Sequence, residues 1–131
     1  MRVLFVTSEV APLIKTGGLA DVSAALPAAL CRLGDDVRVL LPGYSQVLSQ
    51  LPSCKVEATL SGIEGFPEAR LLSSVLPDGV PLLVIECAPL FQREGGIYQD
   101  AQGVDWADNA LRFGLLSKVA AILGGEASPL K

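Results

Sequence analysis

The first apolar run of the chain, residues 3–6, contains no alternating polar position. Such a run is typical of a strand that is covered on both faces of a parallel sheet. After a polar stretch that contains Gly17 and Gly18, apolar residues recur at the spacing of an amphipathic helix. They are Leu19, Val22, Leu26, Ala29, Leu30 and Leu33. We expect this helix to end near Gly34, and Pro27 to bend or divide it.

Four further apolar or alternating runs predict strands along the rest of the chain. They are residues 36–41, 55–61, 69–76 and 80–87. The first of them completes a β-α-β unit with a right-handed crossover. The middle two flank a segment rich in glycine and proline, which predicts an antiparallel hairpin at the edge of the sheet.

The remaining segments predict a short helix at 45–51, a loop at 88–103 and a last helix at 105–123, with Asp105 as its N-cap and Gly124 as its stop. The expected fold class is therefore α/β. More closely, the pattern predicts a Rossmann-like, mostly parallel sheet with an antiparallel edge hairpin.

Composition narrows the class of protein. The chain has 131 residues, half of them hydrophobic, which suits one domain, and no apolar run approaches the length of a membrane helix. The net charge is −4 and there is no basic block, so neither nucleic acid nor a membrane is expected as a partner. No secretory signal is recognisable, and we expect a cytoplasmic protein.

The chain contains no histidine, and its cysteines, Cys31, Cys54 and Cys87, form no C-x-x-C pair. Neither a metal site nor a histidine-based nucleophile is therefore expected. The cysteines are interpreted as buried thiols in a reducing compartment. The dinucleotide fingerprint G-x-G-x-x-G is also missing, so we expect no cofactor.

The turn before the first helix is a candidate anion site. Ligands of such sheets bind beyond the carboxyl ends of the strands, where Lys15 stands. The first amides of a helix lack internal partners, and Gly17 and Gly18 would let a phosphate approach the main chain. A charged hydrogen bond from Lys15 contributes about 1.5–3 kcal/mol, more than the roughly 0.3–1 kcal/mol of a helix end. On spacing alone, a plain glycine turn with a solvated lysine is an equal alternative.

The whole stretch Ser8-Glu-Val-Ala-Pro-Leu-Ile-Lys-Thr-Gly-Gly-Leu-Ala-Asp-Val22 resembles the amino-terminal signature of bacterial glycogen synthases and plant starch synthases. These are retaining, two-domain (GT-B) glycosyltransferases that move glucose from ADP-glucose to the non-reducing end of an α-1,4-glucan. The resemblance implies that Lys15 contacts the donor phosphates and that Gly17 and Gly18 line the donor cleft. It also places Asp21 in that cleft.

The resemblance extends along the chain. The segment Pro42-Gly43-Tyr44 matches the pattern after the second strand, and we expect Tyr44 to pack rather than bind. The family has a tyrosine near its glucan in a loop that matches the one around Tyr98. We expect this ring to be exposed, where it could stack on a sugar or serve as a packing anchor.

The resemblance also implies that the 131 residues are the amino-terminal part of the Rossmann-like glucan-side domain, incomplete and without the second domain. The family's histidine-containing loop and the glutamate at its reaction centre lie further on, so no catalytic residue is assigned. We expect the chain alone to be inactive. We also expect it to self-associate through an unpaired strand edge.

Two other functions stay open at this point. One is a glycosyltransferase that uses a different nucleotide sugar, since related families share a glycine pair after the first strand. The other is a non-catalytic β-α module that binds an anion or a protein partner. Binding of ADP that is lost in Lys15→Ala would support an enzyme fragment, and binding of neither nucleotide nor glucan would leave the module.

Overall fold

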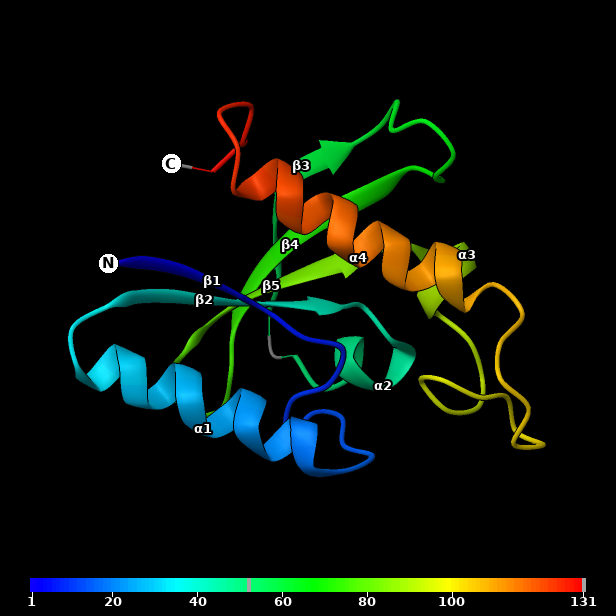
Figure 1. The fold of residues 1–131 in the computed structure, drawn as a ribbon, viewed down its shortest axis with the longest axis horizontal. Coiled ribbons are helices and arrows are strands. Elements are labelled where there is room, and N and C mark those ends of the chain that lie inside the picture. The colour runs from blue at the N-terminus through cyan, green and yellow to red at the C-terminus, as the bar shows by residue number, and fades with distance from the viewer. Residues whose placement is uncertain (52, 131) are drawn as a thin grey trace.

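The computed structural model describes residues 1–51 and 53–130, and five strands form one sheet between helices (Figure 1). The strands are β1 (Arg2–Val6), β2 (Asp36–Pro42), β3 (Lys55–Leu60), β4 (Ala69–Val75) and β5 (Pro81–Glu86). The helices are α1 (Gly18–Arg32), α2 (Ser45–Leu48), α3 (Ala88–Phe91) and α4 (Asn109–Leu123).

The order of strands in the sheet is β1-β2-β5-β4-β3. Strands β1, β2 and β5 are parallel, and β4 is antiparallel to both β5 and β3. It follows that only β4 runs against the other described strands. The predicted α/β class, the mostly parallel sheet and the antiparallel hairpin at its edge are all confirmed.

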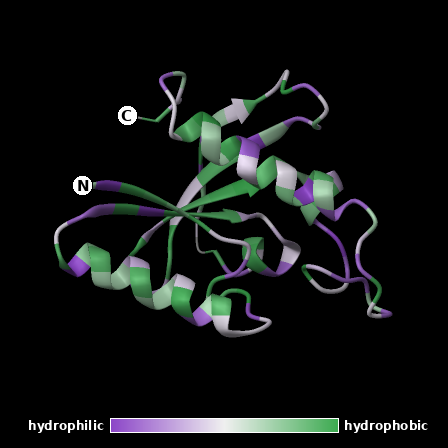
Figure 2. Cartoon of the chain, in the orientation of Figure 1, coloured by the Kyte–Doolittle hydropathy of each residue, from purple (hydrophilic) through white to green (hydrophobic). Residues whose placement is uncertain are grey.

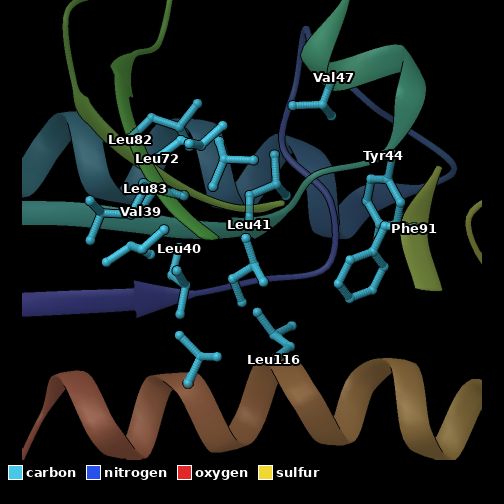
Figure 3. Close-up of a cluster of buried hydrophobic side chains, with 14 of the residues drawn as sticks. Val39, Leu40, Leu41, Tyr44, Val47, Leu72, Leu82, Leu83, Phe91 and Leu116 are labelled. Carbon is cyan, nitrogen blue, oxygen red and sulfur yellow. The ribbon is translucent and has the colours of Figure 1, made fainter. Parts of the chain in front are cut away.

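Helices α1 and α4 cover opposite faces of the sheet, in blue and orange in Figure 1. Leu115, Leu116 and Val119 of α4 are buried, and Figure 3 shows Leu116 pointing toward the sheet. Tyr44 is also buried, as expected, and its ring meets that of Phe91 edge-on at a centroid distance of 5.8 Å (Figure 3). This core fixes the carboxyl ends of β1, β2 and β5 along one edge of the sheet, with β2 in the middle.

Helix α1 packs on the sheet with small residues instead of large ones. Its buried residues are Ala20, Ser23 and Pro27. Leu19, Val22 and Leu26 are 48%, 54% and 44% exposed, and Figure 2 shows hydrophobic positions along the outside of α1. The apolar pattern predicted the helix, but the large residues of the pattern do not face the sheet, because small side chains let the helix approach more closely.

Several predicted boundaries were wrong. Of the two effects predicted for Pro27, division of the helix does not occur, because α1 is one continuous helix. The predicted loop contains α3, and α4 begins at Asn109 with Asp108 as its N-cap, so Asp105 is not the cap. Asp105 instead pairs with Gln99 across an isolated β-bridge.

Two predictions of burial were also wrong. Strand β1 is an edge strand of the described sheet, with exposed ends and a half-buried middle, because it pairs only with β2. Cys54 is exposed, whereas Cys87 is buried and Cys31 is half-buried. In the part of the chain that the structure describes, no helix has both the length and the apolar character needed to cross a membrane.

Two glycines have structural roles that the geometry makes plain. Gly34 has φ +95° and closes α1, with the Asp35 amide bonded to the Leu30 carbonyl at 3.1 Å. At Gly43 a Cβ atom would lie 2.7 Å from the Ile85 carbonyl oxygen, so only glycine fits where β2 ends beside β5. The Gly43 amide donates to that same oxygen at 2.8 Å.

Candidate functional site

The candidate site is the turn between β1 and α1, which we call the glycine turn and define as residues 15–18. It follows the carboxyl end of β1, where ligands bind in sheets of this type. The buried hydroxyls of Thr7 and Ser23 are 2.8 Å apart and join the end of β1 to α1. The first turn of α1 is therefore held at a fixed place beside the end of the strand.

Neither glycine of this turn is needed by the protein's own packing. No heavy atom lies within 4 Å of a Cβ built on Gly17 or Gly18. Neither has a positive φ, and Gly17, the N-cap of α1, is extended at φ −162°. A Cβ atom at either position would lie in open space, so neither the packing nor the φ angles of the described residues require glycine there.

A buried carboxylate fills the inner side of the turn. Glu9 is 2% exposed. One oxygen of its carboxylate accepts hydrogen bonds from the Thr16 amide at 3.1 Å and the Gly17 amide at 3.2 Å. The Thr16 hydroxyl donates to its other oxygen at 2.6 Å. Burial raises the pKa of the Glu9 carboxyl, but hydrogen bonds from Thr16, Tyr98 and Gly17 outweigh burial and leave the pKa below its ordinary value.

The hydrogen bonds to Glu9 divide the four amides of residues 16–19 into two groups. The amides of Thr16 and Gly17 are occupied by the carboxylate. Those of Gly18 and Leu19 find no acceptor among the described residues. Because these two lie at the start of α1, they also carry the partial positive charge of the helix end.

Lys15 lies over the first turn of α1. Its Nζ donates to both carboxylate oxygens of Asp21, at 2.9 and 2.8 Å. The two side chains are 52% and 59% exposed. A pair this exposed contributes only about 0–1 kcal/mol, so a phosphate could draw Lys15 away from Asp21 at little cost.

Tyr98 does not have the exposed ring that the sequence predicted. It is half-buried, and its ring packs against Phe113 with a centroid distance of 5.7 Å. Its hydroxyl donates to Glu9 at 2.7 Å and lies 2.6 Å from the Ser8 hydroxyl. Tyr98 therefore anchors the loop between α3 and α4, residues 92–108, to the floor of the glycine turn.

The 92–108 loop is held at both of its ends. The buried Arg112 guanidinium donates to the Leu90 and Ile97 carbonyls, each at 2.7 Å. Arg93 forms a two-bonded ion pair with Asp108, and the hydrogen bonds from Arg93 hold the pKa of the Asp108 carboxyl below its ordinary value. These contacts thus hold the 92–108 loop in place beside the glycine turn.

The structure brings Lys15, Gly17, Gly18 and Asp21 together at one helix start, and it joins Tyr98 to them through Glu9. Sequence reasoning missed Glu9, which lies in the recognised stretch but has no spacing that separates a turn-holding carboxylate from a surface one. Two cavities of about 340 and 380 Å³ lie elsewhere, one beside β1 and the end of α4, the other beside the far end of α1. The glycine turn is an open wall rather than an enclosed pocket.

Comparison with known proteins identifies the family of this chain. The model of the starch synthase catalytic domain matches residues 2–128. The chain belongs to that family. It is 59% identical over 130 residues to the glycogen synthase of Aromatoleum aromaticum, which covers 99% of this chain and 26% of that protein. It is 55% identical to the glycogen synthase of Nitrosospira multiformis, over 99% of this chain and 27% of that protein.

A solved structure of the same family has a similar fold. It is the catalytic domain of starch synthase IV from Arabidopsis thaliana bound to ADP and acarbose, with a TM-score of 0.68 and 25% identity. The match covers 93% of this chain and 25% of that one. The chain thus spans about a quarter of the length of the starch and glycogen synthases that it matches.

Among the described residues, no three side chains of the metal-binding types are grouped closely enough to hold a metal ion. The groups that the site offers to a ligand are the main-chain amides of Gly18 and Leu19, Lys15 and Asp21. The side-chain charges around the turn are those of Lys15, its partner Asp21 and the buried Glu9, and the free amides of Gly18 and Leu19 add the partial positive charge of the helix start.

Proposed function

We propose that this chain is the amino-terminal part of the Rossmann-like glucan-side domain of a glycogen synthase, an enzyme that transfers glucose from ADP-glucose to the non-reducing end of an α-1,4-glucan. Its glycine turn would hold the diphosphate of the donor. One observation carries the proposal: the space over Gly17 and Gly18 is empty, and nothing in the protein's own packing or backbone requires glycine there.

The groups around that space suit a diphosphate. The free amides of Gly18 and Leu19 would donate to one phosphate, and glycine keeps the main chain accessible. Lys15 would exchange its exposed partner Asp21 for a phosphate oxygen. Asp21, released from Lys15, could then accept hydrogen bonds from hydroxyl groups of the donor sugar.

The relatives support the choice among the three functions considered. Those at 59% and 55% identity are named glycogen synthases. The similar Arabidopsis structure holds ADP and acarbose, a nucleotide and a saccharide. A glycosyltransferase with another nucleotide sugar and a non-catalytic module are both less well supported. We assign no catalytic residue, and expect no glucosyl transfer by the 131 residues alone.

The direct test is a chimaera in which this chain replaces the aligned segment of the A. aromaticum glycogen synthase. We expect ADP-glucose-dependent incorporation of glucose into glycogen, and a strong loss of it in Lys15→Ala. Lys118, exposed on α4, is the matched control, and Lys118→Ala should leave the rate unchanged. Higher activity with UDP-glucose than with ADP-glucose would favour a different donor.

We propose that the glucan lies along the 92–108 loop, with Tyr98 at its inner end as both packing anchor and sugar neighbour. Titration of the chain with maltoheptaose, followed by the fluorescence of Trp106 in that loop, measures this contact. Tyr98→Ala should weaken the titration. Unchanged affinity in this variant would remove Tyr98 from the glucan site.

We also propose a cytoplasmic location and self-association of the 131-residue chain. The outer edge of β1 pairs with no other described strand, and Leu19, Val22 and Leu26 form an exposed apolar stripe on α1. Free strand edges and apolar stripes both promote association. Light scattering at increasing protein concentration should show a rising mass, and a constant monomer mass would contradict it.

A further inference from the structure

We infer that Glu9 is a positioning residue that couples the 92–108 loop to the glycine turn, so that a change in the loop alters how the turn binds a phosphate ligand. The inference rests on the proposed function for its ligand. The coupling itself stands on the contacts of one buried carboxylate with two distant segments of the chain.

Each oxygen of Glu9 has two donors. One oxygen accepts from the Thr16 and Gly17 amides, at 3.1 and 3.2 Å. The other accepts from the Thr16 hydroxyl at 2.6 Å and from the Tyr98 hydroxyl at 2.7 Å. Three of the four donors thus belong to the glycine turn and the fourth to the loop, although 89 positions separate Glu9 from Tyr98.

Among the described residues, no cation forms an ion pair with this carboxylate. Within residues 1–51 and 53–130, none of the ion pairs includes Glu9, although the carboxylate is almost fully buried. A buried charge is costly unless every lone pair has a donor. The four hydrogen bonds therefore depend on one another, and a lost donor leaves the carboxylate free to shift and to take the turn with it.

The turn presents its ligand groups only in the conformation that Glu9 holds. Because Glu9 occupies the Thr16 and Gly17 amides, a phosphate is left with the Gly18 and Leu19 amides and with Lys15. If the carboxylate moved, the first two amides would point elsewhere and the next two would follow along the chain. Tyr98 can act on the ligand groups in this way without touching them.

A role as a charge and a role as a positioning group predict opposite results. Glu9 carries a negative charge beside a site for anions, so neutralisation alone would tighten phosphate binding. Removal of the hydrogen bonds would weaken it instead. Glutamine keeps an acceptor for the two amides and loses the charge, whereas alanine loses both, which makes these two variants the decisive pair.

The experiment measures the Kd for ADP by calorimetry, and amide hydrogen exchange at Thr16 and Gly17, in the 131-residue chain and four variants. The test variants are Glu9→Gln, Glu9→Ala and Tyr98→Phe. The control is Tyr44→Phe, which also removes a hydroxyl beside Glu9, one that donates to the Ser8 carbonyl at 2.7 Å and does not touch the carboxylate. Melting temperatures show that each variant is folded.

We expect Glu9→Ala to weaken ADP binding about tenfold or more, as removal of charged hydrogen bonds does. Glu9→Gln should stay within about threefold of the parent chain or bind more tightly, since its acceptor still holds the two amides. Tyr98→Phe should weaken binding several-fold and speed exchange at Thr16 and Gly17. Tyr44→Phe should lower the melting temperature with both readouts unchanged.

Equal losses in Glu9→Gln and Glu9→Ala would overturn the positioning role. Exchange at Thr16 and Gly17 that is unchanged in Tyr98→Phe would overturn the coupling, whether or not ADP binds. If the parent chain binds no ADP at all, the donor site of the proposed function fails, and the exchange measurement alone decides the coupling.

Discussion

Glycines follow two parallel strands of this protein, directly after β2 and in the glycine turn that leads from β1 into α1, and the two places differ in what lies around them. After β2, a side chain on Gly43 would run into the main chain of β5, at 2.7 Å from the Ile85 carbonyl oxygen. After β1, side chains on Gly17 and Gly18 would meet nothing within 4 Å. The space at Gly43 is filled by the protein itself, whereas the space at Gly17 and Gly18 is left open.

The difference separates two reasons for a glycine. At Gly43 the reason is internal, because β2 and β5 could not pair as they do with a larger residue there. At Gly17 and Gly18 no internal reason is found in the described residues, which is why we look to a ligand. Substitution of glycine is thus expected to change stability at Gly43, and binding at Gly17 and Gly18.

Gly43→Ala should give the largest effect. The added methyl group forces β2 and β5 apart, and we expect a loss of about 2–4 kcal/mol in the free energy of unfolding. Urea denaturation followed by circular dichroism measures it. A variant as stable as the parent chain would mean that the close approach of the two strands is not required.

Lys15→Ala should weaken ligand binding and leave stability nearly unchanged, in contrast to Gly43→Ala. We expect an ADP affinity lower by about tenfold or more, because a charged hydrogen bond to phosphate is lost. The free energy of unfolding should change by less than about 0.5 kcal/mol, since the Lys15–Asp21 pair is exposed. Calorimetry and urea denaturation check the two parts, with Lys118→Ala as the control.

Gly18→Ala sharpens the comparison most closely, because it is the same substitution as the one at Gly43. Gly18 is the first residue of α1, where alanine is the better helix former, so stability should rise by up to about 1 kcal/mol. The new methyl group occupies the open space, and ADP binding should weaken several-fold. Lower stability together with unchanged ADP affinity would remove the distinction between the turns.

The pH dependence of stability should show a smaller effect. The pKa of the Glu9 carboxyl is lowered in the folded protein, so Glu9 stabilises the fold above the ordinary carboxyl pKa of about 4.3. This contribution is lost as the pH falls through that value toward the lower folded pKa. Unfolding free energies between pH 7 and 3 should fall less steeply in Glu9→Gln than in the parent chain, and parallel curves would contradict it.

Much of the fold could be predicted because each strand is an apolar or alternating run, and glycine or proline lies near the ends of most of these runs. The hairpin of β3 and β4 and the β-α-β unit through α1 both follow from such patterns. The face of α1 that packs on the sheet could not be predicted, because Ala20 and Ser23 are buried while Leu19 and Val22 are exposed. Periodicity locates an apolar stripe but does not say whether the fold selects large or small residues for the contact.

The candidate site could likewise be predicted only in part. Lys15, Gly17 and Gly18 could be selected from their order and from the family signature that surrounds them. Glu9 could not, because its role depends on Tyr98, which lies 89 positions further along the chain. Contacts between segments so far apart in sequence leave no local pattern.

The central claim is that a phosphate ligand occupies the open space at the glycine turn, residues 15–18. Titration of isotopically labelled protein with ADP, followed by nuclear magnetic resonance of the backbone amides, tests it most directly. We predict that the largest shifts are those of Gly18 and Leu19, that Gly43 does not move, and that Lys15→Ala suppresses the response. Shifts confined to other regions, or no shifts at millimolar ADP, would contradict the claim.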